Sequence, residues 1–214
     1  MTLYLTSNGF EDNYVAERFK KVVLKKDPDK ASFLVISVQD NESDAFYLQK
    51  TKDELSKIGV TNIDIFELRE EKFNIIKEYD VIYVCGGNTF VYLDRMRKTG
   101  LDKYIINSVG SNRSIYVGVS AGSIIAGPNI EIAGWGKDSD PNYMGLTDLS
   151  GLNLTNMVVY PHYREELKSD LDKFRERYGY QVIELEDNQA VRLSYSDIGS
   201  LKNVISMEYI NKDE

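Results

Sequence analysis

The sequence predicts an α/β protein with a doubly wound, mostly parallel sheet that carries helices on both faces, a three-layer αβα arrangement. Short apolar runs alternate with amphipathic stretches of helical length, as in βαβ units on a parallel sheet. The composition is 42% hydrophobic and 28% charged, which is ordinary for a globular protein. Because a domain has roughly 100–200 residues and α/β folds run larger, the 214 residues are expected to form a single domain, 1–214.

The first strand is expected at Leu3–Thr6, where it ends in the turn-like segment Ser7-Asn8-Gly9. A helix is predicted over residues 12–26, because its apolar side chains recur near helical spacing and Asp27-Pro28-Asp29 then ends it. Phe33–Val38 follows as a strand of the buried type.

The next helix, Ser43–Ile58, is expected to turn Phe46, Leu48, Leu55 and Ile58 toward the core. Apolar runs then predict strands at Ile63–Leu68, Val81–Val84 and, centrally in the sheet, Ile115–Val119, with helices near Thr89–Lys98 and Leu101–Ser108.

The segment Gly127–Gly151 is rich in glycine and has little periodicity, so we expect a long surface loop with one strand around Ile130–Ala133. Loops of this length in compact domains are usually functional or mobile. Beyond it the pattern predicts strands at Met157–Tyr160, Gln181–Leu185, Ala190–Leu193 and Val204–Tyr209 and a helix at Glu165–Tyr178.

Charge and cysteine content exclude several functional classes. The net charge of −8, without a basic block, disfavours nucleic-acid binding. The single cysteine, Cys85, excludes an internal disulfide and a multi-cysteine metal site, and it suits a reducing cytosol. No apolar run approaches the ~20 residues that span a bilayer, and the first residues lack the features of a secretory signal. We therefore expect a soluble, cytoplasmic protein with no metal, cofactor or membrane partner.

The most specific local feature is Gly118-Val119-Ser120-Ala121-Gly122, a complete G-x-S-x-G between a predicted strand and a small apolar stretch able to start a helix. This context is typical of a nucleophile elbow, in which small neighbours leave room for a sharply turned serine. The N–H of Ala121 would then point toward an oxyanion. The alternative is a glycine-rich turn that only packs a helix on its sheet.

A serine hydroxyl needs a base, and His162 is the only histidine in the chain. It directly follows the predicted strand that ends at Tyr160. We expect that strand to belong to the same sheet as the strand before Ser120, so both side chains should emerge at one sheet edge, where α/β active sites lie. The spacing alone does not choose the acidic partner of His162, and the candidates are Asp187, Glu186, Glu184, Asp138, Asp140, Glu165 and Glu166.

Cys85-Gly86-Gly87-Asn88-Thr89 follows another predicted strand and opens a helix. Gly87 would supply a second oxyanion N–H, or the segment would be a capped tight turn in which Asn88 or Thr89 caps the helix. Cys85 itself is expected to be a small buried hydrophobe.

With GGNTF, GVSAGS and PHY in this order, the chain resembles the peptidase E (aspartyl dipeptidase) family, which also includes cyanophycinase. The resemblance extends from the first strand to about Leu193. It implies a serine peptidase for small peptides on a sheet similar to that of class I glutamine amidotransferases. It also implies Ser120 as nucleophile, His162 as base and Asp187 as the acid, with Gly87 and Ala121 forming the oxyanion hole.

After the elbow, the best-known aspartyl dipeptidases have basic and polar residues, whereas this chain has the segment 128–135 with the acidic Glu131. Glu131 would repel a substrate carboxylate by about 1 kcal/mol or more. The resemblance thus extends to the nucleophilic machinery and not to the specificity loop, and it leaves open whether Asp-X dipeptides are cleaved. Asn88, Glu131 and Trp135 are the candidate substrate-binding residues, and Trp135, Tyr143 and Met144 are candidates to line a narrow pocket under the loop.

The leading hypothesis is a serine peptidase that hydrolyses dipeptides or other small peptides. Two alternatives remain: an esterase or acyl hydrolase with the same residues, and a non-catalytic binding protein that keeps the fold. The expected partner is a small peptide substrate, and the sequence is also compatible with a homodimer.

Overall fold

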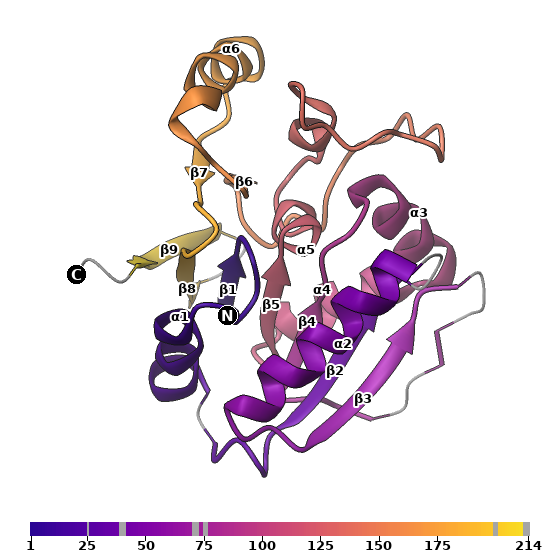
Figure 1. Cartoon of the computed structure of the whole chain (residues 1–214), viewed down its shortest axis with the longest axis vertical. Coiled ribbons are helices and arrows are strands. Elements are labelled where there is room, and N and C mark those ends of the chain that lie inside the picture. The colour runs from indigo at the N-terminus through magenta and orange to yellow at the C-terminus, as the bar shows by residue number, and fades with distance from the viewer. Residues whose placement is uncertain (25, 39–41, 70–72, 75–76, 199–200, 212–214) are drawn as a thin grey trace.

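The computed structural model describes residues 1–24, 26–38, 42–69, 73–74, 77–198 and 201–211 (Figure 1). These residues form a seven-stranded sheet with the order β3-β2-β4-β5-β1-β8-β9. The first five strands in that order are parallel, and β8 and β9 are antiparallel to their neighbours. The bounds are β1 Thr2–Thr6, β2 Ser32–Ser37, β3 Asn62–Glu67, β4 Val81–Val84, β5 Ile115–Val119, β8 Ala190–Ile198 and β9 Leu201–Ile210.

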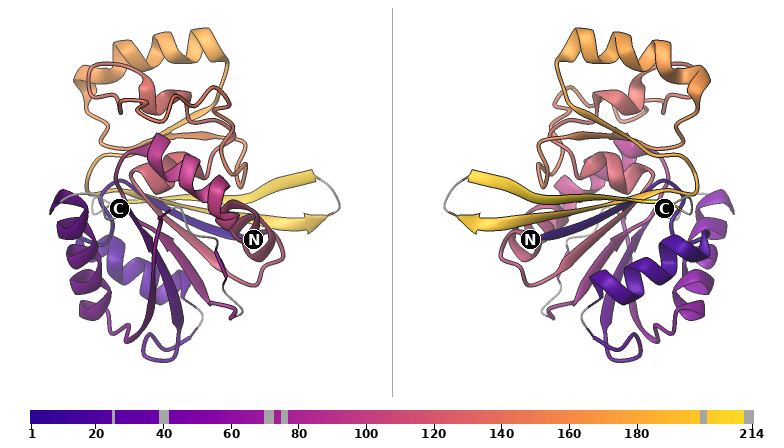
Figure 2. Two further views of the ribbon diagram at one scale, coloured as in Figure 1. Left: turned by 90° about the vertical axis from the view of Figure 1, so that its right-hand side faces the viewer. Right: turned by 90° about the vertical axis from the view of Figure 1, so that its left-hand side faces the viewer.

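Helices cover both faces of this sheet, as expected for a three-layer αβα protein. Figure 2 shows α1 and α2 on one side of the strands and α3 and α4 on the other. The helices are α1 Asn13–Arg18, α2 Glu42–Lys57, α3 Thr89–Thr99, α4 Leu101–Gly110, α5 Ala121–Ile125 and α6 Lys168–Tyr178. A short π-helix, Phe19–Val23, continues α1, so the helix predicted over residues 12–26 ends earlier than expected, and residue 25 lies outside the described part.

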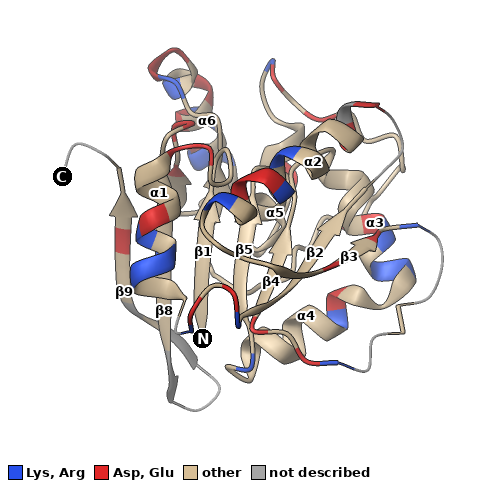
Figure 3. Cartoon of the chain, turned by 60° about the horizontal axis from the view of Figure 1, so that its bottom comes forward, with Lys and Arg blue, Asp and Glu red and all other residues tan. Residues whose placement is uncertain are grey.

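The strands β1, β2, β4 and β5 contain no charged residue, whereas lysines, arginines and carboxylates lie on helices, on loops and on the outer strands β3, β8 and β9 (Figure 3). Strands that are buried on both faces need an unbroken apolar sequence, which is why these runs were recognisable. β5 lies in the middle of the sheet, as predicted, and it leads directly to Ser120.

One expectation about the sheet is wrong. The strand before His162, β6 (Val158–Tyr160), does not join the main sheet but pairs in parallel with β7 (Val182–Glu184). This two-stranded sheet lies with α6 beyond the main sheet (Figure 1). In the main sheet, β1 pairs with β5 on one side and with β8 on the other, so β6 cannot pair with β1.

Three smaller expectations need correction. Residues 131–134 form a 3-10 helix instead of a strand, and the flanking Ile130 is completely buried, so this part of the Gly127–Gly151 segment is not a surface loop. The helix predicted at Glu165–Tyr178 begins with a 3-10 helix, Glu165–Leu167, and continues as α6. Phe46 on α2 is 65% exposed, because it lies two residues from buried Leu48 and so points away from the apolar face.

Within the described ranges, no helix has both the length and the apolar character that crossing a membrane requires.

Candidate active site

Ser120 lies in the sharp turn between β5 and α5, with backbone angles φ 48° and ψ −108°. A positive φ is strained for a residue with a side chain and is typical of functional turns. The flanking glycines make this turn fit. A Cβ on Gly118 would lie 2.7 Å from the backbone of Gly122, and a Cβ on Gly122 would lie 2.4 Å from the carbonyl oxygen of Val84. Both contacts are too short for any side chain, so the turn requires glycine at both positions.

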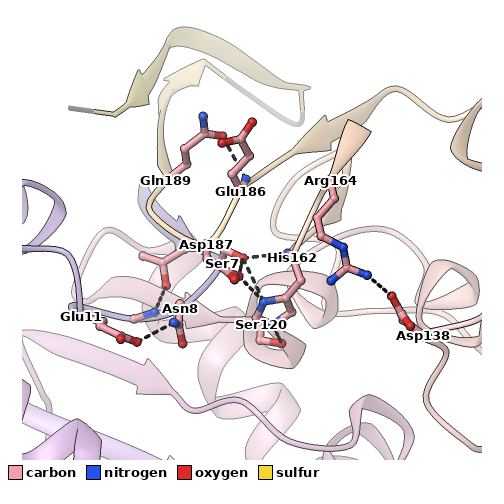
Figure 4. A network of polar contacts seen from close by, with 12 residues as sticks. Ser7, Asn8, Glu11, Ser120, Asp138, His162, Arg164, Glu186, Asp187 and Gln189 are labelled. Carbon is pink, nitrogen blue, oxygen red and sulfur yellow. Dashed lines mark hydrogen bonds and ion pairs between the residues drawn. The ribbon is translucent and has the colours of Figure 1, made fainter. Parts of the chain in front are cut away.

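Ser120, His162 and Asp187 form one chain of polar contacts (Figure 4). The Oγ of Ser120 lies 3.0 Å from Nε2 of His162. The Nδ1 of the same ring lies 2.6 Å from Oδ1 of Asp187. This order of hydroxyl, imidazole and carboxylate is that of a serine-hydrolase triad, in which the carboxylate orients the ring and the ring takes the serine proton.

The other acidic candidates have different partners. The carboxylate of Asp138 pairs with Arg164, and Asp140 accepts hydrogen bonds from the backbone and hydroxyl of Thr89. Glu184 pairs with Arg175, Glu165 accepts from the hydroxyl of Tyr163, Glu166 pairs with Arg164, and the backbone N–H of Glu186 donates to the side chain of Gln189. Of the seven, Asp187 is the one that the structure places on the His162 ring.

His162 reaches Ser120 from the small sheet and not from the edge of the main one. The N–H of Leu185 donates to the carbonyl of Tyr160, and the N–H of Tyr163 donates to the carbonyl of Leu185, at 3.0 and 2.9 Å. These bonds extend the β6–β7 pairing on either side of His162, whose own backbone is left-handed with φ 55°. The ring is thereby directed away from the small sheet and toward the β5–α5 turn.

One residue of the site, Ser7, was not predicted from the sequence. It is fully buried at the end of β1, and its Oγ accepts a hydrogen bond from the backbone N–H of His162 at 2.7 Å. The same Oγ lies 3.4 Å from Oδ1 of Asp187 and 3.4 Å from Nδ1 of His162. The neighbouring carbonyl of Thr6 accepts the backbone N–H of Ser120 at 3.0 Å. A polar residue directly after a parallel strand was the available signal, and it was interpreted only as part of a turn.

Gly87 and Ala121, the two residues expected to supply oxyanion donors, both lie in turns near Ser120. Ala121 is the first residue of α5, so its N–H has no acceptor within the helix. Gly87 has φ 147°, and a Cβ there would lie 2.9 Å from the ring of Tyr92. A Cβ on the adjacent Gly86 would lie 3.4 Å from Cβ of Ser120, so this glycine turn runs close beside the serine.

Two cavities meet at Ser120 and His162. The larger, about 340 Å³, extends between the end of β1 and α2, and Ser7, Gly9, Lys50, Glu54 and Tyr83 are among its lining residues. The smaller, about 110 Å³, is lined in part by Ile124, Ile132, Trp135, Tyr160 and Leu167. Gly87 lines both, so both cavities have access to the same reacting position.

Of the candidate substrate-binding residues, some line a cavity beside Ser120 and others do not. Trp135 lines the smaller cavity, while its indole N–H donates to the carbonyl of Asp170 at 2.8 Å. The side chain of Asn88 caps α3 through the N–H of Val91 and donates to the carbonyl of Pro141, and Glu131 lines neither cavity. Tyr143 and Met144 are exposed and do not line the cavities, which corrects the expectation that they would.

Cys85 is buried at the end of β4, and burial raises the pKa of its thiol to about 12. It therefore remains a protonated, small apolar group, as expected. In the described part of the chain, no group of three or more histidine, cysteine or acidic side chains is arranged to hold a metal ion.

Comparison with known proteins gives consistent similarities. The model of peptidase family S51 matches residues 3–200. An uncharacterized peptidase of Listeria innocua, Lin0382, is 34% identical over 125 residues, which is 57% of this chain and 59% of that protein. Peptidase E of a Nostoc species is 33% identical over 117 residues, 55% of this chain and 46% of that protein. The matched part thus spans about half to three fifths of these curated relatives.

Among solved structures, a candidate peptidase E from Listeria monocytogenes EGD-e superimposes with a TM-score of 0.76. The superposition covers 98% of each chain at 24% sequence identity. This likeness supports the α/β fold.

Proposed function

Because the chain belongs to peptidase family S51, we propose that it is a serine peptidase that hydrolyses dipeptides or other small peptides through an acyl-enzyme on Ser120. The observation that supports this most directly is the continuous chain of contacts from Ser120 Oγ through the His162 ring to Asp187. A serine hydroxyl at an ordinary surface site has no such base.

In the proposed reaction, His162 Nε2 removes the proton of Ser120 as its Oγ attacks the peptide carbonyl. The N–H groups of Gly87 and Ala121 stabilise the oxyanion. The imidazolium then donates its proton to the leaving amine, and the C–N bond breaks. Water, activated by the same ring, cleaves the ester and restores the serine. Asp187 stays ionised and holds the ring in the required tautomer.

The dimensions of the two cavities support a small substrate. A cavity of about 340 Å³ is near the lower end of the range for small-molecule sites, about 300–1,000 Å³, and the second cavity is smaller still. We expect the larger cavity to hold one or two residues on one side of the cleaved bond and the smaller cavity no more than one on the other. Efficient cleavage of long unstructured proteins would contradict the restriction to small peptides.

The direct test is covalent labelling with a small fluorophosphonate, followed by intact mass and by hydrolysis of a dipeptide and ester panel. We expect one adduct on the wild type, none on Ser120→Ala, and peptide turnover that Ser120→Ala lowers by about 10³-fold or more. Ester turnover without peptide turnover would support the acyl hydrolase alternative. A folded wild type with neither adduct nor turnover would favour a binding protein.

A further inference from the structure

The larger cavity beside Ser120 contains a buried carboxylate that the proposed mechanism does not use. Glu54 lies near the C-terminal end of α2, and its side chain is only 6% exposed, yet it lines the same cavity as Ser120 and His162. Carboxylates are rarely buried to this degree unless they are paired. The position of Glu54 next to the reacting serine therefore calls for a specific partner.

Only one of the two carboxylate oxygens of Glu54 accepts a hydrogen bond among the described residues. Oε2 accepts the backbone N–H of Phe10 at 2.8 Å. Oε1 is buried and has no hydrogen-bond partner among the described residues. The nearest cation, Nζ of Lys50, is 3.9 Å away from it, beyond hydrogen-bond range. Leaving a charged buried acceptor unsatisfied is costly, unless a ligand supplies the missing donor.

Lys50 cannot easily turn to fill this role, because other groups hold it at the mouth of the cavity. Its ammonium contacts the carboxylate of Glu11 and donates to Oδ1 of Asn8 at 3.2 Å. Glu11 is more than half exposed, so the pair lies toward solvent and leaves the deeper Glu54 to face the cavity. The charge of Lys50 is thus largely compensated, and the interior of the cavity is acidic.

A second unsatisfied acceptor lies beside Glu54. The hydroxyl of Tyr83 is completely buried, lines the cavity and forms no hydrogen bond within the described part of the chain. Both groups converge on Gly9: a Cβ there would lie 2.8 Å from Oε2 of Glu54 and 3.1 Å from the Tyr83 oxygen. Both contacts are too close for a side chain on Gly9, so the two oxygens lie near one another beside its backbone, and all three residues line the same cavity.

We propose that this cavity binds a positively charged group of the substrate, with Glu54 as its counter-ion and Tyr83 as a second hydrogen-bond acceptor. This inference rests on the proposed peptidase function and specifies its substrate class. An ammonium group carries several donors and compensates the buried charge, which a neutral side chain does not do. A carboxylate side chain would face Glu54 with a like charge, which disfavours acidic peptides. The cation is either a lysine-type side chain or the free α-ammonium of a dipeptide.

Binding to the inactive Ser120→Ala protein tests this without turnover. The probes for titration calorimetry are Lys-Ala, its analogue norleucyl-alanine, whose side chain is uncharged, N-acetyl-Lys-Ala, Ala-Lys and Asp-Ala. The second substitution is Glu54→Gln, which keeps an acceptor for the Phe10 N–H and removes the charge. Glu176→Gln, an exposed residue of α6, is the control for net charge.

We expect Glu54→Gln to weaken the binding of Lys-Ala about tenfold or more and Glu176→Gln to leave it unchanged. If Glu54→Gln lowers the affinity for Lys-Ala more than that for norleucyl-alanine, the cation is the lysine side chain. If it lowers both affinities equally, and N-acetyl-Lys-Ala binds weakly, the cation is the α-ammonium. Tighter binding of Asp-Ala than of Lys-Ala, with both weakened by Glu54→Gln, would place the α-ammonium and not the side chain at Glu54. Unchanged binding of Lys-Ala in folded Glu54→Gln, or no binding of any probe, would overturn the proposal. Because these measurements need no catalysis, they separate this inference from the labelling test of the proposed function.

Discussion

The hydroxyl of Ser7 accepts a hydrogen bond from the backbone N–H of His162, across a separation of 155 residues in sequence. The bond joins the end of β1 to the loop that follows β6, and hence the main sheet to the small one. Because the two sheets share no strand pairing in the described part of the chain, this contact is one of the few that fix His162 relative to Ser120.

Ser7→Ala should therefore reduce activity although Ser7 takes no part in proton transfer. The substitution leaves the buried N–H of His162 without an acceptor, which costs about 1–3 kcal/mol and loosens the ring's position. We expect kcat/KM and the rate of fluorophosphonate labelling to fall about tenfold or more. Labelling at the wild-type rate would show that the loop holds His162 without Ser7.

Asp187→Asn and Glu186→Gln form a matched pair on adjacent residues of one turn. The first substitution would present an amide to Nδ1 and favour the wrong tautomer of His162, which costs about 10⁴-fold in a buried triad. Because the Asp187 side chain is 68% exposed, water substitutes in part, and we expect a loss of about 10²-fold. Glu186→Gln should remain within about twofold of wild type. Steady-state kinetics decides, and a larger effect from Glu186→Gln would assign the acid to that residue.

Gly122→Ala and Gly110→Ala test whether the elbow glycines are required by packing. An added Cβ at Gly122 would lie 2.4 Å from the carbonyl oxygen of Val84, so β4 and α5 would have to separate. We expect a loss of about 3 kcal/mol or more in the free energy of unfolding. At Gly110 a Cβ meets nothing within 4 Å, so alanine should be neutral or stabilise by up to about 1 kcal/mol. Equal stabilities in urea would contradict the packing argument.

Glu54→Gln should change how stability depends on pH. Burial raises the pKa of Glu54 above its ordinary value of 4.5, against the lowering effects of the Phe10 N–H and Lys50. A carboxyl whose pKa is higher in the folded than in the unfolded state loses stability as pH rises between the two values. Relative to wild type, Glu54→Gln should therefore gain stability between pH 4 and pH 8, as measured by urea unfolding at both. A relative loss over that interval would mean that the buried charge is compensated in the free protein.

The sequence predicted the structure best at positions where only one type of residue fits. Apolar runs without charge identified β1, β2, β4 and β5, because strands covered on both faces tolerate little else. Gly118 and Gly122 marked the turn at Ser120 because no other residue fits there. The family resemblance, not the spacing, singled out Asp187.

What the sequence did not reveal depends on contacts between distant segments. The expectation that His162 and Ser120 share a sheet edge was wrong, since β6 pairs with β7, yet the two side chains meet through the loop contacts with Ser7 and Leu185. Nothing local distinguishes a strand of a seven-stranded sheet from one of a two-stranded sheet. The burial of Glu54 was equally hidden, because a glutamate in an amphipathic helix is ordinarily solvated.

The contacts of Thr6 with Ser120 and of Ser7 with His162 and Asp187 also determine when during folding the proposed triad can assemble. Ser7 leaves the ribosome well before Asp187, so the two can meet only after the 180 residues that separate them in sequence have been synthesised. Contacts of such long range form slowly, since the loop between them must first be ordered. A nascent chain that contains Ser120 but not yet His162 and Asp187 therefore lacks the proposed triad, which forms only after residue 187 has been synthesised and folded.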